Sequence, residues 1–373
     1  MIALFVLCAG FCVYTYALFP LLLHLRAARI EEREPPPPET WPRVSVVIAA
    51  HDERERLPAK LDSLAALDYP PGRFETIVVS DGSTDGTREL LERAAARDPS
   101  LVALHYAPAS GKPTALNAGV AAATGDVLVF MDARQRISPG SVRALVARLA
   151  DPTVGAVSGE LVLGAAEGGE AASVGLYWRY ERWIRHNESR LFSTTGATGA
   201  LYAIRREDYV PHAPDVLLDD FETPVRLLER GLRTVLEPRA RAYDRAEESA
   251  GGEFRRKVRT LAGNYQSFRR HRWLFDPRRN PVWWQFLSHK VFRLLVPYAL
   301  CGALAAAALG EGAFLDAMLV AQLLFYAAAL VGFLGFDSRL SSFARTFVQL
   351  NAAAVVGAWR HLSGRASVRW RSP

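Results

Sequence analysis

The feature that most constrains this chain is a run of apolar residues from Met1 to Leu25 that contains no Lys, Arg, Asp or Glu. A run of this length can cross a bilayer as one helix. Because it lacks a basic start and a small-residue cleavage site, we expect an uncleaved transmembrane anchor over residues 1–25. Arg26, Arg29 and Arg33 follow directly, and the positive-inside rule then places the next domain in the cytoplasm. A buried core helix is the alternative.

The C-terminal part of the sequence also has a membrane pattern. Residues 276–293 are basic and aromatic, which predicts an amphipathic helix lying in the headgroup region. Residues 294–360 form the predicted C-terminal membrane region, which contains three apolar runs: Leu294–Leu309, Phe314–Phe336 and Phe343–Trp359. The third run is ambiguous, because a third crossing would put the basic tail of residues 361–373 outside. Both a third crossing and a re-entrant or interfacial segment stay open.

The net charge of +6 and the pI near 9.3 fit an anionic membrane surface better than nucleic acid. The arginines gather at the ends of the apolar runs and between Arg255 and Arg279. The three cysteines all lie inside apolar runs and lack metal-ligand spacing. We therefore expect neither nucleic-acid binding, nor a disulfide framework, nor a structural zinc site.

Between the anchor and the membrane region, the sequence predicts a soluble α/β domain over residues 43–275. Residues 26–42 form a basic and proline-rich linker, whose Pro35–Pro38 run favours a stiff, extended spacer. Short β-branched or apolar runs then alternate with helical segments, the predicted strands being Val44–Ala50, Phe74–Val79 and Val127–Met131. This alternation predicts a mostly parallel sheet with helices on both faces, which binds ligands at the carboxyl ends of its strands.

Carboxylates follow each of these three strands. Asp52 and Glu53 follow the first strand, Asp81 the second and Asp132 the third. Such groups can accept hydrogen bonds from a base or a ribose, or hold a divalent cation beside a diphosphate. Asp85 and its neighbours favour a turn and a helix cap instead. Asp81 and Asp132 are the stronger candidates for a nucleotide site.

Three further segments carry candidate residues. Lys112 precedes the helical segment Leu116–Gly119, where its cation could reach a phosphate, although a solvated lysine is the default reading. The glycine pattern matches neither a Walker loop nor a dinucleotide fingerprint, which argues against an NTPase or a dehydrogenase. Asp219 and Asp220 supply two adjacent carboxylates, of which one could be a general base and the other a helix N-cap. The small-residue segment Thr194–Ala200 predicts either an acceptor channel or a plain loop.

Taken together, these segments resemble the family 2 glycosyltransferases, the inverting, membrane-bound group with a GT-A fold that includes cellulose, hyaluronan and poly-N-acetylglucosamine synthases. The resemblance rests on order and spacing, and covers roughly Arg43 to Phe275. Its motifs are Val46–Glu53, Ser80–Asp85, Gly111–Lys112 with Leu116–Gly119, Asp132, and Asp219–Asp220. It implies a GT-A type, mostly parallel α/β sheet with transmembrane helices at both ends.

The resemblance also implies roles for individual residues. Asp220, with Asp219 beside it, would be the catalytic base, and Asp81 would contact the uracil and ribose of a UDP-sugar. The donor site as a whole would comprise Ala50, Glu53, Asp81, Lys112, Asp132 and Arg134. The family's Gln-x-x-Arg-Trp motif falls at Arg256–Thr260, so Arg259, with Arg256, would brace the leaving diphosphate. Glutamine and tryptophan are absent from this motif, which weakens the case for long-chain processivity.

A divalent cation, Mg²⁺ or Mn²⁺, is implied by the Asp-x-Asp motif, of which Asp132 would be the first acid and the metal ligand. Arg134 stands in place of the second acid. A guanidinium matches phosphate oxygens bidentately, so Arg134 could supply cationic charge to the diphosphate. The sequence thus leaves a metal-bound and an arginine-assisted leaving group as alternatives.

The function expected from the sequence is a multi-pass inner-membrane glycosyltransferase whose catalytic domain is cytoplasmic. It would transfer sugar from a nucleotide-sugar donor to a glycan or lipid-linked acceptor, as in exopolysaccharide or cell-envelope synthesis, in contact with membrane lipids and export or synthase partners. The alternative is a catalytically inactive scaffold that binds nucleotide within a glycan synthase. Arg134 motivates the alternative, whereas Asp81, Asp132, Asp220 and Arg259 argue against it.

Overall fold

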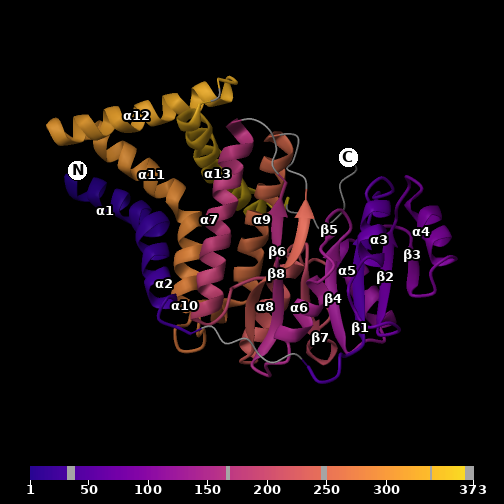
Figure 1. Ribbon diagram of the computed structural model, residues 1–373. Coiled ribbons are helices and arrows are strands. Elements are labelled where there is room, and N and C mark those ends of the chain that lie inside the picture. The colour runs from indigo at the N-terminus through magenta and orange to yellow at the C-terminus, as the bar shows by residue number, and fades with distance from the viewer. Residues whose placement is uncertain (32–37, 165–168, 245–249, 337, 366–373) are drawn as a thin grey trace. The chain divides into compact units, whose positions relative to one another are not determined.

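The computed structural model describes residues 1–31, 38–164, 169–244, 250–336 and 338–365 (Figure 1). Expectations for residues 32–37 and 366–373, which include most of the proline run and of the basic tail, lie outside this range. The chain divides into two compact units. The first, here the helical unit, comprises residues 1–30, 165–191 and 245–366; the second, here the sheet unit, comprises residues 31–164 and 192–244.

The sheet unit is built on one eight-stranded sheet with the order β3-β2-β1-β4-β7-β6-β8-β5 (Figure 1). The strands are β1 Val44–Ala50, β2 Phe74–Asp81, β3 Leu101–Tyr106, β4 Val127–Asp132, β5 Arg136–Ile137, β6 Val154–Leu163, β7 Tyr202–Arg205 and β8 Arg233–Asp244. Strands β3, β2, β1 and β4 are mutually parallel, whereas β7 is antiparallel to β4 and β6. The predicted mostly parallel sheet is confirmed.

Alternating side chains of the central strand face two separate apolar cores. Val46 and Ile48 of β1 lie in the core that contains residues of α3, α4 and α6. Val47 and Ala49 lie in the opposite core, which contains residues of α5 and α8. The helices are α3 Leu57–Ala65, α4 Thr87–Ala95, α5 Lys112–Ala122, α6 Ser141–Arg148 and α8 Asp219–Glu229, with a 3₁₀ turn at Arg206–Asp208. Because both faces are covered, β1 is fully buried and apolar throughout its length apart from Ser45.

The register of the parallel strands brings three of the predicted site positions to one edge of the sheet. Ala50 of β1 pairs with Ser80 of β2, and Ala49 pairs with Asp132 of β4. Asp81 and Asp132 therefore end neighbouring strands on either side of β1. This edge is where open α/β sheets bind ligands.

The helical unit consists of helices from three parts of the chain. They are α1 Ile2–Val13, a π-helical segment Tyr14–Leu18, α2 Phe19–Ala27, α7 Gly169–Leu191, α9 Ala250–Arg270, a 3₁₀ turn Arg272–Phe275, α10 Trp283–Gln285, a π-helical segment Phe286–Val291, α11 Phe292–Leu309, α12 Ala313–Phe333 and α13 Arg339–Leu362. Ile184 of α7 packs against Phe19 and Leu23 of α2. The range 43–275, expected as one domain, is thus divided, because α7 and α9 pack with the helical unit.

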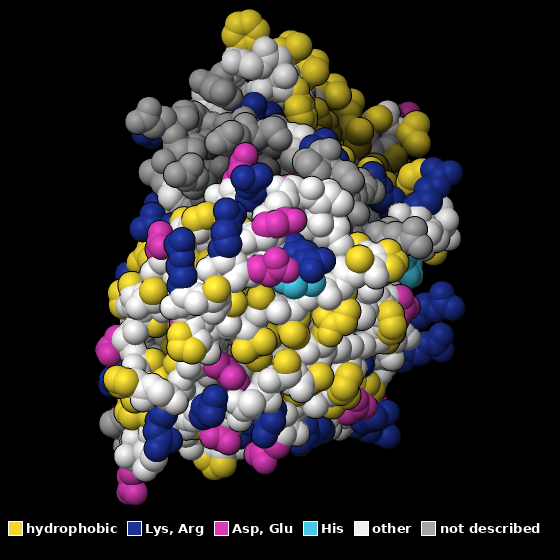
Figure 2. Space-filling model, turned by 90° about the vertical axis from the view of Figure 1, so that its right-hand side faces the viewer, with side chains coloured by type: hydrophobic (Ala, Val, Ile, Leu, Met, Phe, Trp, Pro, Cys, Tyr) yellow, Lys and Arg dark blue, Asp and Glu magenta, His cyan; other side chains and the backbone are white. Residues whose placement is uncertain are grey.

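Three helices of the described chain are long and apolar enough to cross a membrane: Ile2–Ala27, Trp283–Leu309 and Ala313–Phe333. Residues 283–309 form one helix, so part of the expected interfacial segment is continuous with the expected span that follows it. α12 exposes large apolar side chains, among them Val320, Leu324 and Leu330, each at least 55% exposed, and the surface at the top of Figure 2 is accordingly rich in hydrophobic side chains. Apolar exposure along a whole helix is typical of a face that contacts lipid.

Candidate functional site

Four charged side chains from three elements meet at the carboxyl edge of the sheet. The Lys112 Nζ lies 2.8 Å from Oδ1 of Asp132 and 3.2 Å from Oδ2 of Asp219. Asp220 follows Asp219, and the two open helix α8. The structure therefore brings together the lysine, the strand-end acid and the acidic pair predicted from the sequence, as one cluster with a central cation.

Local sequence explains why the charges face one another. Lys112 is the first residue of α5 and is followed by Pro113, whose fixed φ suits a helix start. Gly111 precedes it with φ of 97°, a conformation that glycine adopts without strain. Asp219 and Asp220 occupy the first turn of α8, where the helix dipole favours negative charge.

Asp220 has the properties of a general base. Its Oδ2 accepts a hydrogen bond of 3.2 Å from the backbone N–H of Gly199. Burial and the neighbouring charge of Asp219 raise the pKa of Asp220 from 3.8 to about 6. A carboxylate with this pKa is largely ionised at neutral pH. It is also basic enough to accept the proton of a hydroxyl group as that group reacts.

Asp219 stays ionised beside it. Burial alone would raise the pKa of Asp219, but the cations of Lys112 and His212 outweigh burial and lower it. The same carboxylates act on the lysine, because they hold the pKa of Lys112 above its usual value although burial opposes this. The two neighbouring acids are thus pushed in opposite directions, which is how sites separate the tasks of two carboxyl groups.

Asp81 is an internal anchor for the loop that leads into α5. Its side chain is buried, and its two oxygens accept hydrogen bonds from the backbone N–H groups of Ser110 at 2.8 Å and Gly111 at 2.7 Å. Gly82 approaches the same loop so closely that a Cβ there would lie 2.6 Å from the nitrogen of Ala109. Asp81 therefore fixes the position of Lys112 through the backbone, and its expected contact with a nucleotide is a proposal.

The segment after β1 forms a polar turn against the end of β2. Asp52 has a positive φ of 54°, and its Oδ1 accepts a hydrogen bond from the N–H of Thr84. Asp85 accepts from the N–H and hydroxyl of Thr87, the first residue of α4, so it forms the predicted turn, whereas the N-cap position is Gly86 and has no side-chain cap. Ala50 is buried at the strand end. Burial raises the pKa of Glu53, although the Arg56 guanidinium opposes the shift.

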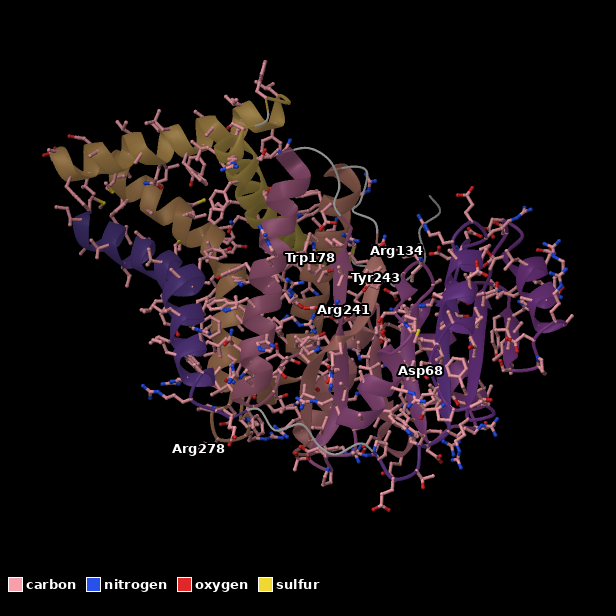
Figure 3. All side chains as sticks on the ribbon, viewed as in Figure 1. Asp68, Arg134, Trp178, Arg241, Tyr243 and Arg278 are labelled. Atoms are coloured by element: carbon pink, nitrogen blue, oxygen red, sulfur yellow. The ribbon has the colours of Figure 1, made fainter. Side chains whose placement is uncertain are left out.

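Arg134 forms an ion pair with Asp244, a residue that the sequence analysis does not identify as a candidate. Its guanidinium lies 2.5 Å from Oδ2 of Asp244, the last residue of β8, and Gln135 donates to the same oxygen at 2.9 Å. Figure 3 labels Arg134 and Tyr243, the neighbour of Asp244. The only sequence signal for Asp244 was its position at the end of a long alternating strand. Arg134 thus supplies positive charge at the rim while held by an internal acid.

For the expected divalent cation, the site offers one carboxylate as a ligand, that of Asp132. Within the described ranges, no group of three or more His, Cys, Asp or Glu side chains is arranged to hold an ion. The Asp132 side chain is 36% exposed, and only its Oδ1 is used by Lys112 in the described hydrogen bonds. Mg²⁺ in nucleotide sites is held by one or two carboxylates together with substrate phosphates. The residues present fit that arrangement, with Asp132 as the protein ligand.

A second network, not predicted from the sequence, holds the loop before α8. The amide of Asn117 donates to the carbonyl of His212 and accepts from the N–H of His212, both at 2.8 Å. Tyr209 donates to the same Asn117 oxygen at 2.6 Å. Asn117 lies within the Leu116–Gly119 motif, and it links α5 to the chain that leads into Asp219. The segment Thr194–Ala200 is a loop before β7, and its Gly199 faces Asp220.

Arg256 and Arg259 lie on α9 in the helical unit. Arg256 pairs with Glu253, and Arg259 is exposed. Their expected contact with the leaving diphosphate is a proposal, because it joins residues of the two units.

Comparison with known proteins shows which family the central part of the chain matches. The family described as "Glycosyl transferase family 2" matches residues 45–210. The protein described as "Probable glycosyltransferase YdaM" of Bacillus subtilis (strain 168) is 28% identical over 232 residues, 60% of this chain and 55% of that protein. The poly-beta-1,6-N-acetyl-D-glucosamine synthase of Staphylococcus aureus (strain COL) is 24% identical, over 60% of this chain and 55% of its own length. The chain thus spans about half the length of these relatives.

One solved structure is similar along nearly the whole chain. The mannosyltransferase PcManGT from Pyrobaculum calidifontis, solved in complex with GDP-Man and Mn²⁺, superposes with a TM-score of 0.74 and is 26% identical. The match covers 97% of this chain and 99% of that one. The predicted GT-A fold with apolar helices towards both ends is thereby confirmed.

Proposed function

Because this chain belongs to glycosyltransferase family 2, we propose that it transfers one sugar at a time from a nucleotide-sugar to a hydroxyl acceptor with inversion at the anomeric carbon. The observation that carries the proposal is the cluster of Lys112, Asp132, Asp219 and Asp220 at the carboxyl edge of the sheet. Within it, Asp220 has a pKa of about 6 and Asp132 has an oxygen available for the donor side.

In the proposed mechanism, the Asp220 carboxylate takes the proton from the acceptor hydroxyl as its oxygen attacks the anomeric carbon. The new carbon–oxygen bond forms as the bond between that carbon and the diphosphate breaks, so the nucleoside diphosphate leaves with the electron pair. A single displacement inverts the configuration. Lys112, held between Asp132 and Asp219, is placed to offset the charge that develops on the diphosphate.

Asp132 would hold the divalent cation through the oxygen that Lys112 does not use. When bound, such a cation neutralises charge on the diphosphate oxygens. Arg134 would add charge beside it, and Arg256 and Arg259 would contact the departing group from α9. These assignments take support from the strand-end position of Asp132 and from the cationic rim that Arg134 forms.

Replacing Arg134 with aspartate should sharpen the dependence of activity on Mg²⁺ or Mn²⁺, because a second acid would follow Asp132 at the spacing of an Asp-x-Asp motif. Activity is measured across a titration of each cation. Arg134→Asn is the matched control, since it removes the guanidinium without adding a ligand. An unchanged cation dependence in Arg134→Asp counts against a role for position 134 at the diphosphate.

The donor is proposed to be a UDP-sugar, with GDP-mannose as the first competitor to test, because the structurally similar mannosyltransferase was solved with GDP-Man. The acceptor is proposed to be a glycan or a lipid-linked hydroxyl. Three candidate spans support a multi-pass protein of the inner membrane with the sheet unit in the cytoplasm. Export or synthase partners would act together with it.

The experiment that tests the proposal measures nucleotide release and sugar transfer by the detergent-purified full chain across a panel of UDP- and GDP-sugars, with and without Mg²⁺ or Mn²⁺. The expected result is release from one donor that is lost in Asp220→Asn. Silence across the panel with intact nucleotide binding would instead favour the inactive scaffold, for which the substitution of the second Asp-x-Asp acid by Arg134 is the motivating observation.

A further inference from the structure

The helical unit contains a cavity of about 400 Å³ whose lining is largely apolar. It is bordered by the π-helical segment after α1 and by α7, α9, α11 and α13. Its apolar and aromatic walls include Tyr16, Tyr177, Tyr180, Phe343, Phe347 and Leu350. A volume of this size lies in the range of small-molecule sites.

At one end of the lining lies Lys257, which has no carboxylate within hydrogen-bonding distance among the described residues. The Lys257 Nζ lies 3.9 Å from Oε1 of Glu253, beyond hydrogen-bonding distance. It lies instead over the rings of Tyr177 and Trp178, at 4.6 and 4.9 Å from the centroids; Figure 3 labels Trp178 on α7. Burial lowers the pKa of Lys257, and the carboxylates of Glu253 and Glu181 do not restore it. This ammonium would be stabilised by a further anion.

A second cation in the lining is only partly satisfied. Arg293 pairs through Nη1 with Glu181, which also contacts His289. In the described part of the chain its Nε and Nη2 atoms are buried without a hydrogen-bond partner, and the guanidinium lies over the rings of Tyr16 and Tyr180. Buried N–H groups of this kind usually have partners, so two more donors would gain from an anionic oxygen.

The cavity also borders candidate membrane spans. Tyr16 belongs to the span Ile2–Ala27, and Arg293 belongs to the span Trp283–Leu309. A cavity with hydrocarbon-like walls at the level of such helices favours a hydrocarbon chain over water, and its cations favour an anionic group. These two requirements are met together by an amphiphile and by neither a free sugar nor an uncharged lipid.

We propose that this cavity binds one lipid molecule whose phosphate headgroup lies at Lys257 and Arg293 and whose hydrocarbon chain packs against Phe343, Phe347 and Leu350. Binding alone is proposed, so the inference is independent of the transferase activity of the sheet unit. The lipid phosphate would place an anionic oxygen within hydrogen-bonding distance of Lys257, and the hydrocarbon chain would cover the apolar wall and so remove it from water.

The test measures binding of dioctanoyl phosphatidic acid to the full chain in detergent by native mass spectrometry and thermophoresis. Dioctanoylglycerol, which has the same chains without the phosphate, and inorganic phosphate are the comparison ligands. We expect saturable 1:1 binding of phosphatidic acid, at least tenfold tighter than that of either comparison ligand, since a charge-assisted hydrogen bond accounts for a factor of ten or more.

Lys257→Met should weaken phosphatidic acid binding at least tenfold, and Lys257→Arg should retain it. Leu350→Trp, which fills the cavity, should also abolish it. Arg269→Met is the matched control, because Arg269 is an exposed cation on the same helix outside the lining, and it should bind normally. Equal affinity for dioctanoylglycerol, equal affinity for inorganic phosphate, or unchanged binding in both Lys257→Met and Leu350→Trp would overturn the proposal. Circular dichroism shows which variants are folded.

Discussion

Replacing Asp220 with asparagine is expected to lower kcat by about 10²- to 10⁴-fold, the range that a general base contributes. Asparagine keeps the shape of the side chain but cannot take a proton from the acceptor. Donor affinity should be retained, because Lys112 and Asp132 are unchanged. Single-turnover transfer with a radiolabelled donor measures the loss, and Glu55→Gln, which changes an exposed carboxylate of the same unit, is the control. Wild-type kcat in Asp220→Asn would contradict the assignment.

The same substitution is expected to stabilise the fold at neutral pH. The pKa of Asp220 is about 6 in the folded chain against 3.8 as its ordinary value, so the folded state binds more protons between these two pH values. Stability is therefore lost as pH rises through this window, and the loss is complete above pH 6. The shift corresponds to about 3 kcal/mol at most, or about 1–2 kcal/mol after partial solvent screening. Asp220→Asn should recover this at pH 8, measured as a higher Tm than wild type.

Replacing Lys112 with methionine is expected to lower kcat/KM by about 10²- to 10³-fold, the effect of removing one preorganised charge partner of a transition state. The substitution also leaves the acids Asp132, Asp219 and Asp220 without their shared cation. Since Lys112 lowers the pKa of Asp220, its loss raises that pKa further. The ascending acid limb of the pH–rate profile, which should lie near pH 6 in the wild type, then moves to higher pH.

Asp219→Asn provides the opposite shift and so a matched comparison. The charge of Asp219 contributes to raising the pKa of Asp220, and its removal moves the acid limb to lower pH. The profile of kcat/KM from pH 4.5 to 9 measures both variants. If the acid limb stays at the same pH in Lys112→Met and in Asp219→Asn, the ionisation that limits the reaction belongs to another group.

The sequence predicted the sheet and the types of residue at its edge because both depend on short-range patterns. Three β-branched or apolar runs ended in carboxylates, and parallel strands bring their ends together. Asp81, Asp132 and Asp220 therefore lie at the expected ends of β2, β4 and the start of α8. The polar turn at Asp85 follows from the same local chemistry.

The pairing of the site residues could not be predicted, because the partners are far apart in sequence. Lys112 meets Asp132 and Asp219, and Arg134 meets Asp244, which lies more than one hundred residues away. Asp81 is buried and orders the backbone of the loop before Lys112, a role that stands beside its proposed contact with the nucleotide. A carboxylate pattern cannot distinguish these roles, since a buried acid that orders backbone amides and an exposed acid that meets substrate have the same local sequence.

The division of residues 43–275 between two units was also outside the reach of local patterns. α7 and α9 are amphipathic helices, and an amphipathic helix can pack its apolar face against a sheet as well as against other helices. The structure packs them with α2 and α13 instead. Which surface an amphipathic helix covers depends on shapes that form only when the whole chain has folded.

The proposed displacement is tested most directly by the anomeric configuration of the product, determined by NMR after transfer from an α-linked donor. A single displacement with Asp220 as base predicts a β-linked product. An α-linked product would contradict it, because retention requires a different mechanism from the one this site is built to perform.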